Sequence, residues 1–267
     1  MSAVIKLSSP ATREFWEIPV LFEDEHLLAL DKPVGLDTTP DPENLKRPSL
    51  LKLLHTGIAA QKPWALERKL DQLKNVAEPD REVGGVLLLA KTKPAFIALA
   101  NLSSSGKIHT RYVALAQGEL HEQSFEVIAK LSPHPVKPGV MRVDSSAGKK
   151  AETRFEVLET FPRQGCALLA CEPLMDRPHQ VRVHASHVGL KIVGDQVYGG
   201  KPLWLSRLKP DYRLKPGREE KPLIARPALH IEQVILPHPV TGESVTVTSE
   251  WPRDLKVAVK YLRQFAA

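Results

Sequence analysis

The sequence predicts an α+β domain with a central, mixed, mostly antiparallel sheet and helices on its outer faces. Residues 83–90 (VGGVLLLA) form a nearly continuous apolar run, the pattern of a strand that is buried on both faces. Two hairpins are predicted further along, within residues 152–174 and 229–248. Helical patterns lie between these strands without strict alternation, which favours α+β over a parallel α/β fold.

The N-terminal half begins with two short predicted strands in residues 18–30, on either side of a polar turn. A break at residues 31–35 (DKPVG) follows, and the polar, proline-rich residues 38–48 are typical of a loop. The spacing of residues 49–60 predicts a helix with Ser49 as its N-cap. A second helix is predicted from Pro94, which suits a first helical position, and a strand at residues 110–118 follows it.

The C-terminal half mixes hairpins with helices. Residues 131–150 are rich in Pro, Gly, Ser and Lys, which predicts a long exposed loop. Strands at residues 152–158 and 166–174 should pair around the turn at 162–165. Asp176 is expected to cap a helix over residues 177–188, which Gly189 ends. Residues 199–226 are irregular and basic, and a hairpin (229–236 with 244–248) and an amphipathic helix (254–265) complete the chain.

Composition and charge limit the kinds of partner and the cellular compartment that we expect for this chain. The 267 residues carry a formal charge of +6, which favours a polyanionic partner but suits a basic enzyme of small molecules equally well. Cys166 and Cys171 are five residues apart in one predicted strand, so they face opposite sides and cannot pair. Without a disulfide framework, a signal peptide or a membrane-length apolar run, we expect a cytoplasmic protein.

Four segments carry a resemblance to a known family. They are residues 22–35, which end in Lys-Pro-Val-Gly; residues 80–91 (DREVGGVLLLAK); residues 111–115 (RYVAL); and residues 177–184 (RPHQVRVH), followed by 194–199 (GDQVYG). In order and spacing these segments resemble the RluA family of pseudouridine synthases, from about residue 20 to residue 255.

The resemblance implies an isomerase that converts uridine to pseudouridine in a structured RNA, ribosomal or transfer RNA, with no cofactor and no metal. It implies the pseudouridine synthase catalytic fold with an RNA-binding cleft, where three residues converge. Asp80 would be the catalytic carboxylate, Arg182 would hold it ionised at salt-bridge distance, and Tyr112 would stack on the uracil. Each of these residues also has a simpler interpretation, as a turn residue, a solvated arginine or a core tyrosine.

Other residues are expected to contact the RNA. Some lie in the matched segments, and others in the basic stretch 199–226, where Trp204 and Tyr212 alternate with cations. A solvated loop remains an alternative for that stretch. His179, His184 and His187 do not predict a metal site, because only the last two share a helical face. The expected substrate-binding residues are Arg81, Arg177, His179, Gln180, Lys201, Arg207, Lys209 and Arg213.

Two aspartates compete for the catalytic position. The string Arg68-Lys69-Leu70-Asp71 looks closer to the family's His-Arg-Leu-Asp, but only Asp80 has the family's spacing to Gly85 and the strand behind it. In that register, Ala77-Glu78-Pro79 replaces His-Arg-Leu. Glu78 would repel phosphate, so Arg81 is a candidate to replace the family's arginine.

These departures leave two functional hypotheses. The first is an active pseudouridine synthase, and the second is an RNA-binding protein on the same fold with weak or lost catalysis. An unrelated hydrolase is disfavoured because no Gly-x-Ser-x-Gly or metal-ligand motif occurs. We expect a monomer with a short extension (residues 1–17) and one catalytic domain (18–267), without a separate N-terminal RNA-binding domain.

Overall fold

The computed structural model describes residues 3–214 and 217–266. The chain divides into two compact units, and each is described by itself. Unit 1 comprises Met1–Thr110 and Ile231–Glu250, and unit 2 comprises Arg111–His230 and Trp251–Ala267. None of the helices in the described part of the chain has both the length and the apolar character needed to cross a membrane.

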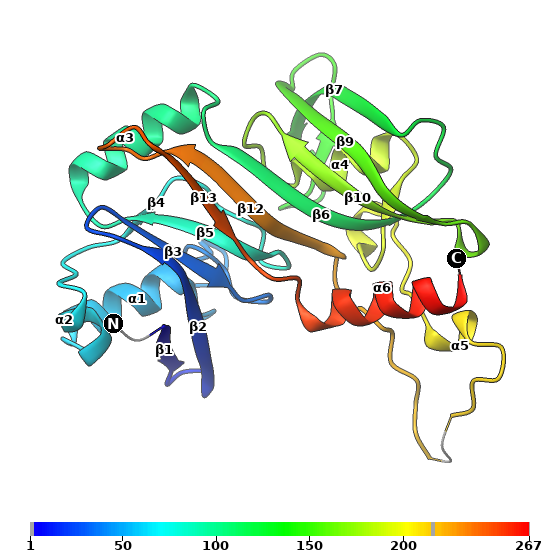
Figure 1. Cartoon of the computed structure of the whole chain (residues 1–267), viewed down its shortest axis with the longest axis horizontal. Coiled ribbons are helices and arrows are strands. Elements are labelled where there is room, and N and C mark those ends of the chain that lie inside the picture. Colours follow the sequence, from blue (N-terminus) through cyan, green and yellow to red (C-terminus); the bar gives the residue numbers. More distant parts are fainter. Residues whose placement is uncertain (1–2, 215–216, 267) are drawn as a thin grey trace. The chain divides into compact units, whose positions relative to one another are not determined.

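Unit 1 is built on a sheet whose first four strands pair antiparallel (Figure 1). Its strands follow the order β1 (Val4–Ser9), β2 (Glu14–Glu23), β3 (Leu27–Lys32), β5 (Gly84–Ala90) and β12 (Leu229–Pro237, in this unit from Ile231 onward). The short strand β4 (Lys74–Asn75) pairs with the end of β5, and β13 (Ser244–Thr248) pairs with β12. The predicted strand pair in residues 18–30, the buried strand and the C-terminal hairpin are confirmed.

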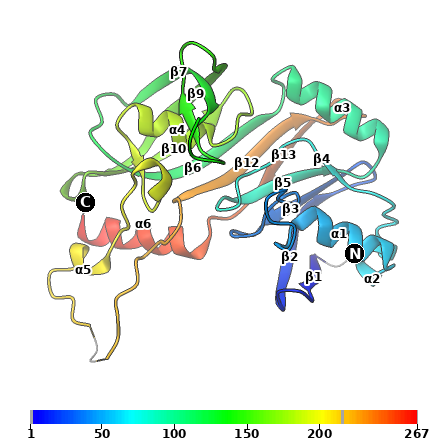
Figure 2. The same ribbon diagram turned by 180° about the vertical axis from the view of Figure 1, so that it is seen from behind.

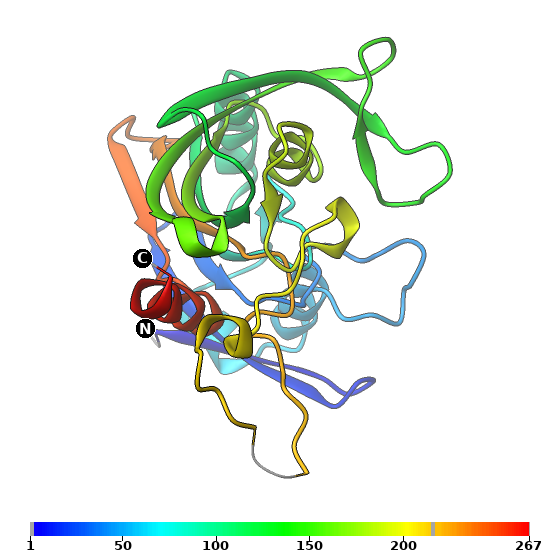
Figure 3. The ribbon, with the colours of Figure 1, turned by 90° about the vertical axis from the view of Figure 1, so that its right-hand side faces the viewer.

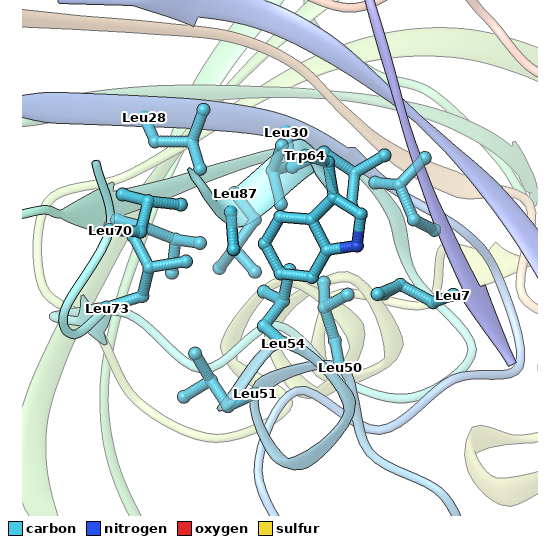
Figure 4. Packing of buried hydrophobic residues seen from close by; sticks show 14 of the residues in the cluster. Leu7, Leu28, Leu30, Leu50, Leu51, Leu54, Trp64, Leu70, Leu73 and Leu87 are labelled. Carbon is cyan, nitrogen blue, oxygen red and sulfur yellow. The ribbon is translucent and has the colours of Figure 1, made fainter. Parts of the chain in front are cut away.

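The core of unit 1 lies between this sheet and two helices, α1 (Leu50–Ala59) and α2 (Pro63–Glu67). Figure 4 shows leucines of α1 facing leucines of β3 and β5 around the indole of Trp64. Each such buried leucine contributes roughly 1.5–3 kcal/mol. Ser49 occupies the predicted N-cap position without a side-chain cap. The N-cap of α3 (Lys93–Ser104) is Thr92, whose hydroxyl accepts from the amide of Ala95.

Unit 2 contains a second run of antiparallel strands, in the order β6 (His109–Gln117), β10 (Cys166–Pro173), β9 (Lys149–Phe161), β7 (Ser124–Pro133) and β8 (Met141–Val143). A two-residue strand, β11 (Lys191–Ile192), pairs with β6. Helix α4 (Gln180–His187) packs against β7, β8, β9 and β10, and Figure 3 shows the green strands curving around it.

The rest of unit 2 is mostly irregular. Single 3-10 turns occur at η1 (Pro162–Gln164) and η2 (Gln196–Tyr198), and α5 (Leu205–Leu208) is one turn long. Figures 1 and 2 both show α5 beside the C-terminal helix α6 (Arg253–Phe265), which buries Leu255, Val259 and Leu262. The irregular basic segment and the amphipathic helix are confirmed. Both cysteines are free and buried in β10.

Two sequence-based predictions about unit 2 are wrong. Residues 131–150 are not a long loop, because they hold the end of β7, all of β8 and the start of β9. Leu131 and Ala151 face the core there, and the turn-forming residues are confined to the two connections. Helix α4 begins at Gln180 rather than at residue 177, and its N-cap is His179 rather than Asp176, because His179 adopts a left-handed backbone conformation that interrupts the helix.

Gly85 offers a direct test of the packing beside the Asp80 segment. Its φ is +113°, and a Cβ atom there would overlap the main chain of Ile231 on β12. We expect Gly85→Ala to lower the free energy of unfolding by about 2–4 kcal/mol, because strain and overlap add. The control Gly106→Ala has a φ of +68° but open space around its Cβ, so it should cost about 1 kcal/mol. Urea denaturation measures both variants. If Gly85→Ala and Gly106→Ala lost the same free energy of unfolding, the predicted overlap between a Cβ at residue 85 and Ile231 would be contradicted.

Candidate active site

Asp80 lies in the turn that connects β4 to β5. The amide of Val83 donates to the main-chain oxygen of Asp80 at 3.0 Å, which closes the turn. The amide of Gly35 donates to the oxygen of Arg81 at 2.8 Å, and the hydroxyl of Thr38 donates to the oxygen of Pro79 at 3.2 Å. The turn is therefore held through its main-chain carbonyls by the residues that follow β3.

The side chain of Lys32 contacts the main chain of this turn and is only 1% exposed. Its ammonium group donates to the oxygens of Val83 at 2.8 Å and Asp80 at 3.2 Å. Burial lowers the pKa of Lys32 to about 8, and the charge of Asp80 opposes that decrease. A buried ammonium surrounded by carbonyl oxygens fixes the position of the loop that carries Asp80.

The competing aspartate, Asp71, belongs to a structural segment. Arg68 is 3% exposed, and its guanidinium donates to Glu23 at 3.0 Å. Lys91 donates to the same carboxylate at 3.1 Å, and Leu70 lies in the core of unit 1. The Arg-Lys-Leu-Asp string thus contributes an arginine and a leucine to the interior, while Asp71 is exposed. This placement supports the register that selects Asp80.

In unit 2, Arg182 forms a buried ion pair with Asp195. The guanidinium Nε lies 2.7 Å from one carboxylate oxygen and Nη2 lies 2.9 Å from the other, which is the two-pronged geometry that arginine favours. Arg182 is 3% exposed and Asp195 is 1% exposed. Asp195 lies in the matched segment 194–199. The structure places it as the residue that orients Arg182.

Tyr198 contacts Arg182 from another direction. The guanidinium carbon lies 5.2 Å from the centre of the Tyr198 ring, a cation–π distance. The phenol oxygen accepts from the amide of Met141 on β8 at 2.9 Å and lies 2.8 Å from Nδ1 of His179. His179 has a φ of +55°, a strained conformation for a residue other than glycine. The strain and the hydrogen bonds together fix the start of the helix that carries Arg182.

Tyr112, on β6, shares a sheet face with α4. The registers place it opposite Cys171 on β10, and Cys171 opposite Phe155 on β9. Thr153, two residues before Phe155 and hence on the same face, makes hydrogen bonds to Gln180 and His184 of α4. Tyr112 is half-buried, and the registers place it on the sheet face that α4, the helix of Arg182, covers.

The other polar residues of α4 support the helix. Gln180 is buried and donates to the oxygen of Glu152 at 2.9 Å and to the hydroxyl of Thr153 at 3.0 Å. Nδ1 of His184 lies 2.9 Å from the same hydroxyl. Burial lowers the pKa of His184 to about 4, so its ring is neutral at pH 7. Gln180 thus holds the helix on the sheet.

The remaining predicted RNA contacts are more open. Arg81 is exposed and lies 3.8 Å from Asp37, and Arg177 donates to the main-chain oxygen of Lys150. The structure therefore gathers Arg182, Asp195, Tyr198 and His179 in unit 2 and holds Asp80 against Lys32 in unit 1. The convergence of Asp80 with Tyr112 and Arg182 stays a prediction. Four cations of the basic segment are exposed: Lys201, Arg207, Lys209 and Arg213.

Sequence reasoning missed two contributors to this site. Lys32 was matched only as part of a Lys-Pro-Val-Gly turn, which gives no sign that its side chain is buried. Tyr198 was matched within residues 194–199 but was given no role. Asp195 and Tyr198 lie three residues apart in the matched segment 194–199. That segment was the sequence signal that could have identified both partners of Arg182.

Comparison with known proteins decides the family. Residues 26–187 match the family model described as RNA pseudouridylate synthase. The chain belongs to the RNA pseudouridine synthases. This family membership makes it an isomerase that acts on RNA, as the resemblance implied.

Named relatives of this pseudouridine synthase agree. The chain is 32% identical to ribosomal large subunit pseudouridine synthase D of Zymomonas mobilis, over 97% of its own length and 77% of the relative. It is 30% identical to the protein of the same name from Xanthomonas campestris, over 100% of its own length and 76% of the relative. The solved structure of human RNA pseudouridylate synthase domain containing 4 matches with a TM-score of 0.66 at 21% identity, covering 91% of this chain and 92% of the other. The predicted fold is confirmed.

The buried ammonium of Lys32 predicts a pH dependence. Activity should fall as the pH rises through about 8, because Lys32 loses the proton that binds the Asp80 turn. Its ordinary pKa is 10.5, so the folded state disfavours the charged form. The contribution of this group to stability therefore rises between pH 8 and 10.5, and unfolding does not explain the loss. Single-turnover rates across this range provide the measurement.

The matching variant is Lys32→Met, which keeps the buried volume and removes the charge. Because a buried cation can often be replaced by an apolar side chain without loss of stability, the variant should fold. We expect it to be slower at pH 7 and to lack the decrease above pH 8. An unchanged alkaline decrease in Lys32→Met would assign that decrease to another group.

The Arg182–Asp195 pair can be tested with a double-mutant cycle. Asp195→Asn should lower the free energy of unfolding by about 3 kcal/mol, because a buried guanidinium loses its carboxylate. Adding Arg182→Met should restore much of that stability without restoring activity. Urea denaturation measures the first effect and a pseudouridine assay the second. A double variant that is no more stable than Asp195→Asn would show that Asp195 has a structural role independent of Arg182.

Proposed function

We propose that this enzyme isomerises uridine to pseudouridine in large-subunit ribosomal RNA, with Asp80 as its catalytic carboxylate. The observation that carries the proposal is the Asp80 turn, which is held over the buried ammonium of Lys32 at the start of β5. The ribosomal target rests on the names of the relatives from Zymomonas and Xanthomonas. A cytoplasmic monomer is part of the same proposal.

The reaction rearranges bonds within one nucleotide. The bond between C1′ of the ribose and N1 of the uracil breaks, which leaves positive charge on the sugar. The base turns, a bond forms between C5 and C1′, and C5 loses a proton while N1 gains one. An ionised Asp80 would stabilise the sugar cation, attack it, or remove a sugar proton. No atom is gained or lost overall, so the balance requires no cofactor.

The proposal gives the unit 2 residues supporting roles. Arg182, oriented by Asp195 and Tyr198, would keep Asp80 ionised and in position. Tyr112, on the same sheet face as Arg182, would stack on the uracil once the nucleotide has left its helix. The proposal places Asp80 within salt-bridge distance of Arg182, as the family resemblance implies.

A binding function without catalysis is the second candidate. The observation that favours it is Ala77-Glu78-Pro79, which stands where the family has His-Arg-Leu. A glutamate at this place repels phosphate instead of attracting it. Arg81, which is exposed on the same turn, is the cation best placed to compensate.

One assay separates these functions. Wild-type protein is incubated with pseudouridine-free bacterial large-subunit ribosomal RNA, and new pseudouridines are mapped chemically. We expect Asp80→Asn to reduce the single-turnover rate by about 10³-fold, because it removes the charge that stabilises the sugar cation. Asp71→Asn is the matched control and should retain wild-type activity.

The two possible failures have different meanings. No pseudouridine from the wild type in ribosomal or transfer RNA would leave RNA binding as the function. Full activity of Asp80→Asn together with an inactive Asp71→Asn would show that the catalytic register lies at Asp71.

A further inference from the structure

Residues 130–150 concentrate the positive charge of the chain. They contain five cations and one acid, Asp144, a net charge of +4 in a protein whose total is +6. The sequence predicts a long exposed loop here, but the residues comprise the end of β7, all of β8, the start of β9 and the two connections between them. We call these five cations the hairpin surface: Lys130, Lys137, Arg142, Lys149 and Lys150.

The register places like charges side by side. Lys130 on β7 lies directly opposite Lys150 on β9, so their Cβ atoms are about 5 Å apart. Arg142 on β8 lies opposite Ser132, two residues along β7 and therefore on the same face as Lys130. A directly opposed lysine pair destabilises a sheet unless an anion lies between the two groups. These three cations point away from the face that α4 covers.

The surface continues around the edge of the sheet. Lys149 lies opposite the buried Leu131, so it belongs to the face on which α4 packs. Lys137 is exposed in the connection between β7 and β8, where Nδ1 of His134 accepts from the amides of Val136 and Lys137. Cations are thus present on both faces and at the edge strand.

Little negative charge offsets these cations. The carboxylate of Asp144 accepts from Ser146, Ala147 and Ser132, and it pairs with Arg142 at 2.9 Å. Lys150 lies 3.6 Å from Glu152. In the described part of the chain, Lys130, Lys137 and Lys149 have no carboxylate within ion-pair distance.

We infer that the hairpin surface binds the phosphate backbone of the RNA substrate, as a contact region separate from Asp80 and from the basic segment 199–226. The inference rests on the proposed function for the identity of the polyanion. A group of exposed cations that extends from one face of the sheet around its edge suits a flexible chain of phosphates, because each cation can approach a different phosphate. The Met141–Tyr198 hydrogen bond joins β8 to the surroundings of Arg182 within the same unit.

The test is the salt dependence of RNA binding. The variant Lys130→Gln/Lys150→Gln removes two charges and should be about as stable as wild type, because it removes the Lys130–Lys150 repulsion together with the Lys150–Glu152 ion pair, whose lysine is exposed. Binding to pseudouridine-free bacterial large-subunit ribosomal RNA is measured by filter retention over a range of KCl concentrations. We expect the slope of log Kd against log salt to decrease by roughly 1.5–2, and Kd at low salt to rise roughly tenfold.

The matched control is Lys93→Gln/Lys260→Gln, which removes two exposed lysines on α3 and α6 and should leave the slope unchanged. Lys137→Gln/Lys149→Gln is a second test variant with the same expected decrease, should the first be poorly folded. Equal slopes for wild type, control and both test variants would overturn the inference.

Filter retention measures RNA binding, so its result does not depend on whether the enzyme forms pseudouridine. If the wild type forms no pseudouridine but the hairpin variants lower the salt slope, the RNA contact stands and the proposed isomerisation fails. If the wild type is active and the variants bind with an unchanged slope, the isomerisation stands and the hairpin surface fails.

Discussion

Burial of positive charge is the constraint on which the candidate site depends. A cation removed from water is tolerated only where acceptors are fixed around it. Lys32 satisfies this condition with the carbonyls of the Asp80 turn, and Arg182 satisfies it with the carboxylate of Asp195. The same contacts that make burial possible therefore determine where the turn and the guanidinium lie.

The sheet of unit 2 uses its two faces differently. One face carries Tyr112 and is covered by α4, so its side chains are held by core packing and by the hydrogen bonds of Thr153. The other face carries Lys130 and Lys150, which are exposed to solvent. Rigid packing suits groups that must align with a single base, whereas mobile lysines suit a backbone of variable path.

Much of this arrangement was predictable from local pattern. The apolar run behind Asp80 identified β5, and its spacing favours Asp80 over Asp71 as the predicted catalytic residue. The burial of Lys32 was not predictable, because a lysine before proline in a polar turn is normally solvated. The start of α4 was misplaced because His179 adopts a left-handed backbone conformation, which is uncommon for residues other than glycine and which the sequence pattern does not reveal. Residues 131–150 were misread because their prolines and glycines dominate a segment whose strands are short.

The contacts of the Asp80 turn also explain how the sequence can depart from its family at residues 77–79. Lys32, Gly35 and Thr38 all bind main-chain carbonyls, from Pro79 to Val83. Such contacts do not depend on which side chains the turn carries. Replacing His-Arg-Leu by Ala-Glu-Pro therefore changes what the turn presents to RNA while leaving the support of Asp80 intact. If the enzyme is altered by this departure, the effect should fall on RNA capture rather than on the position of the carboxylate.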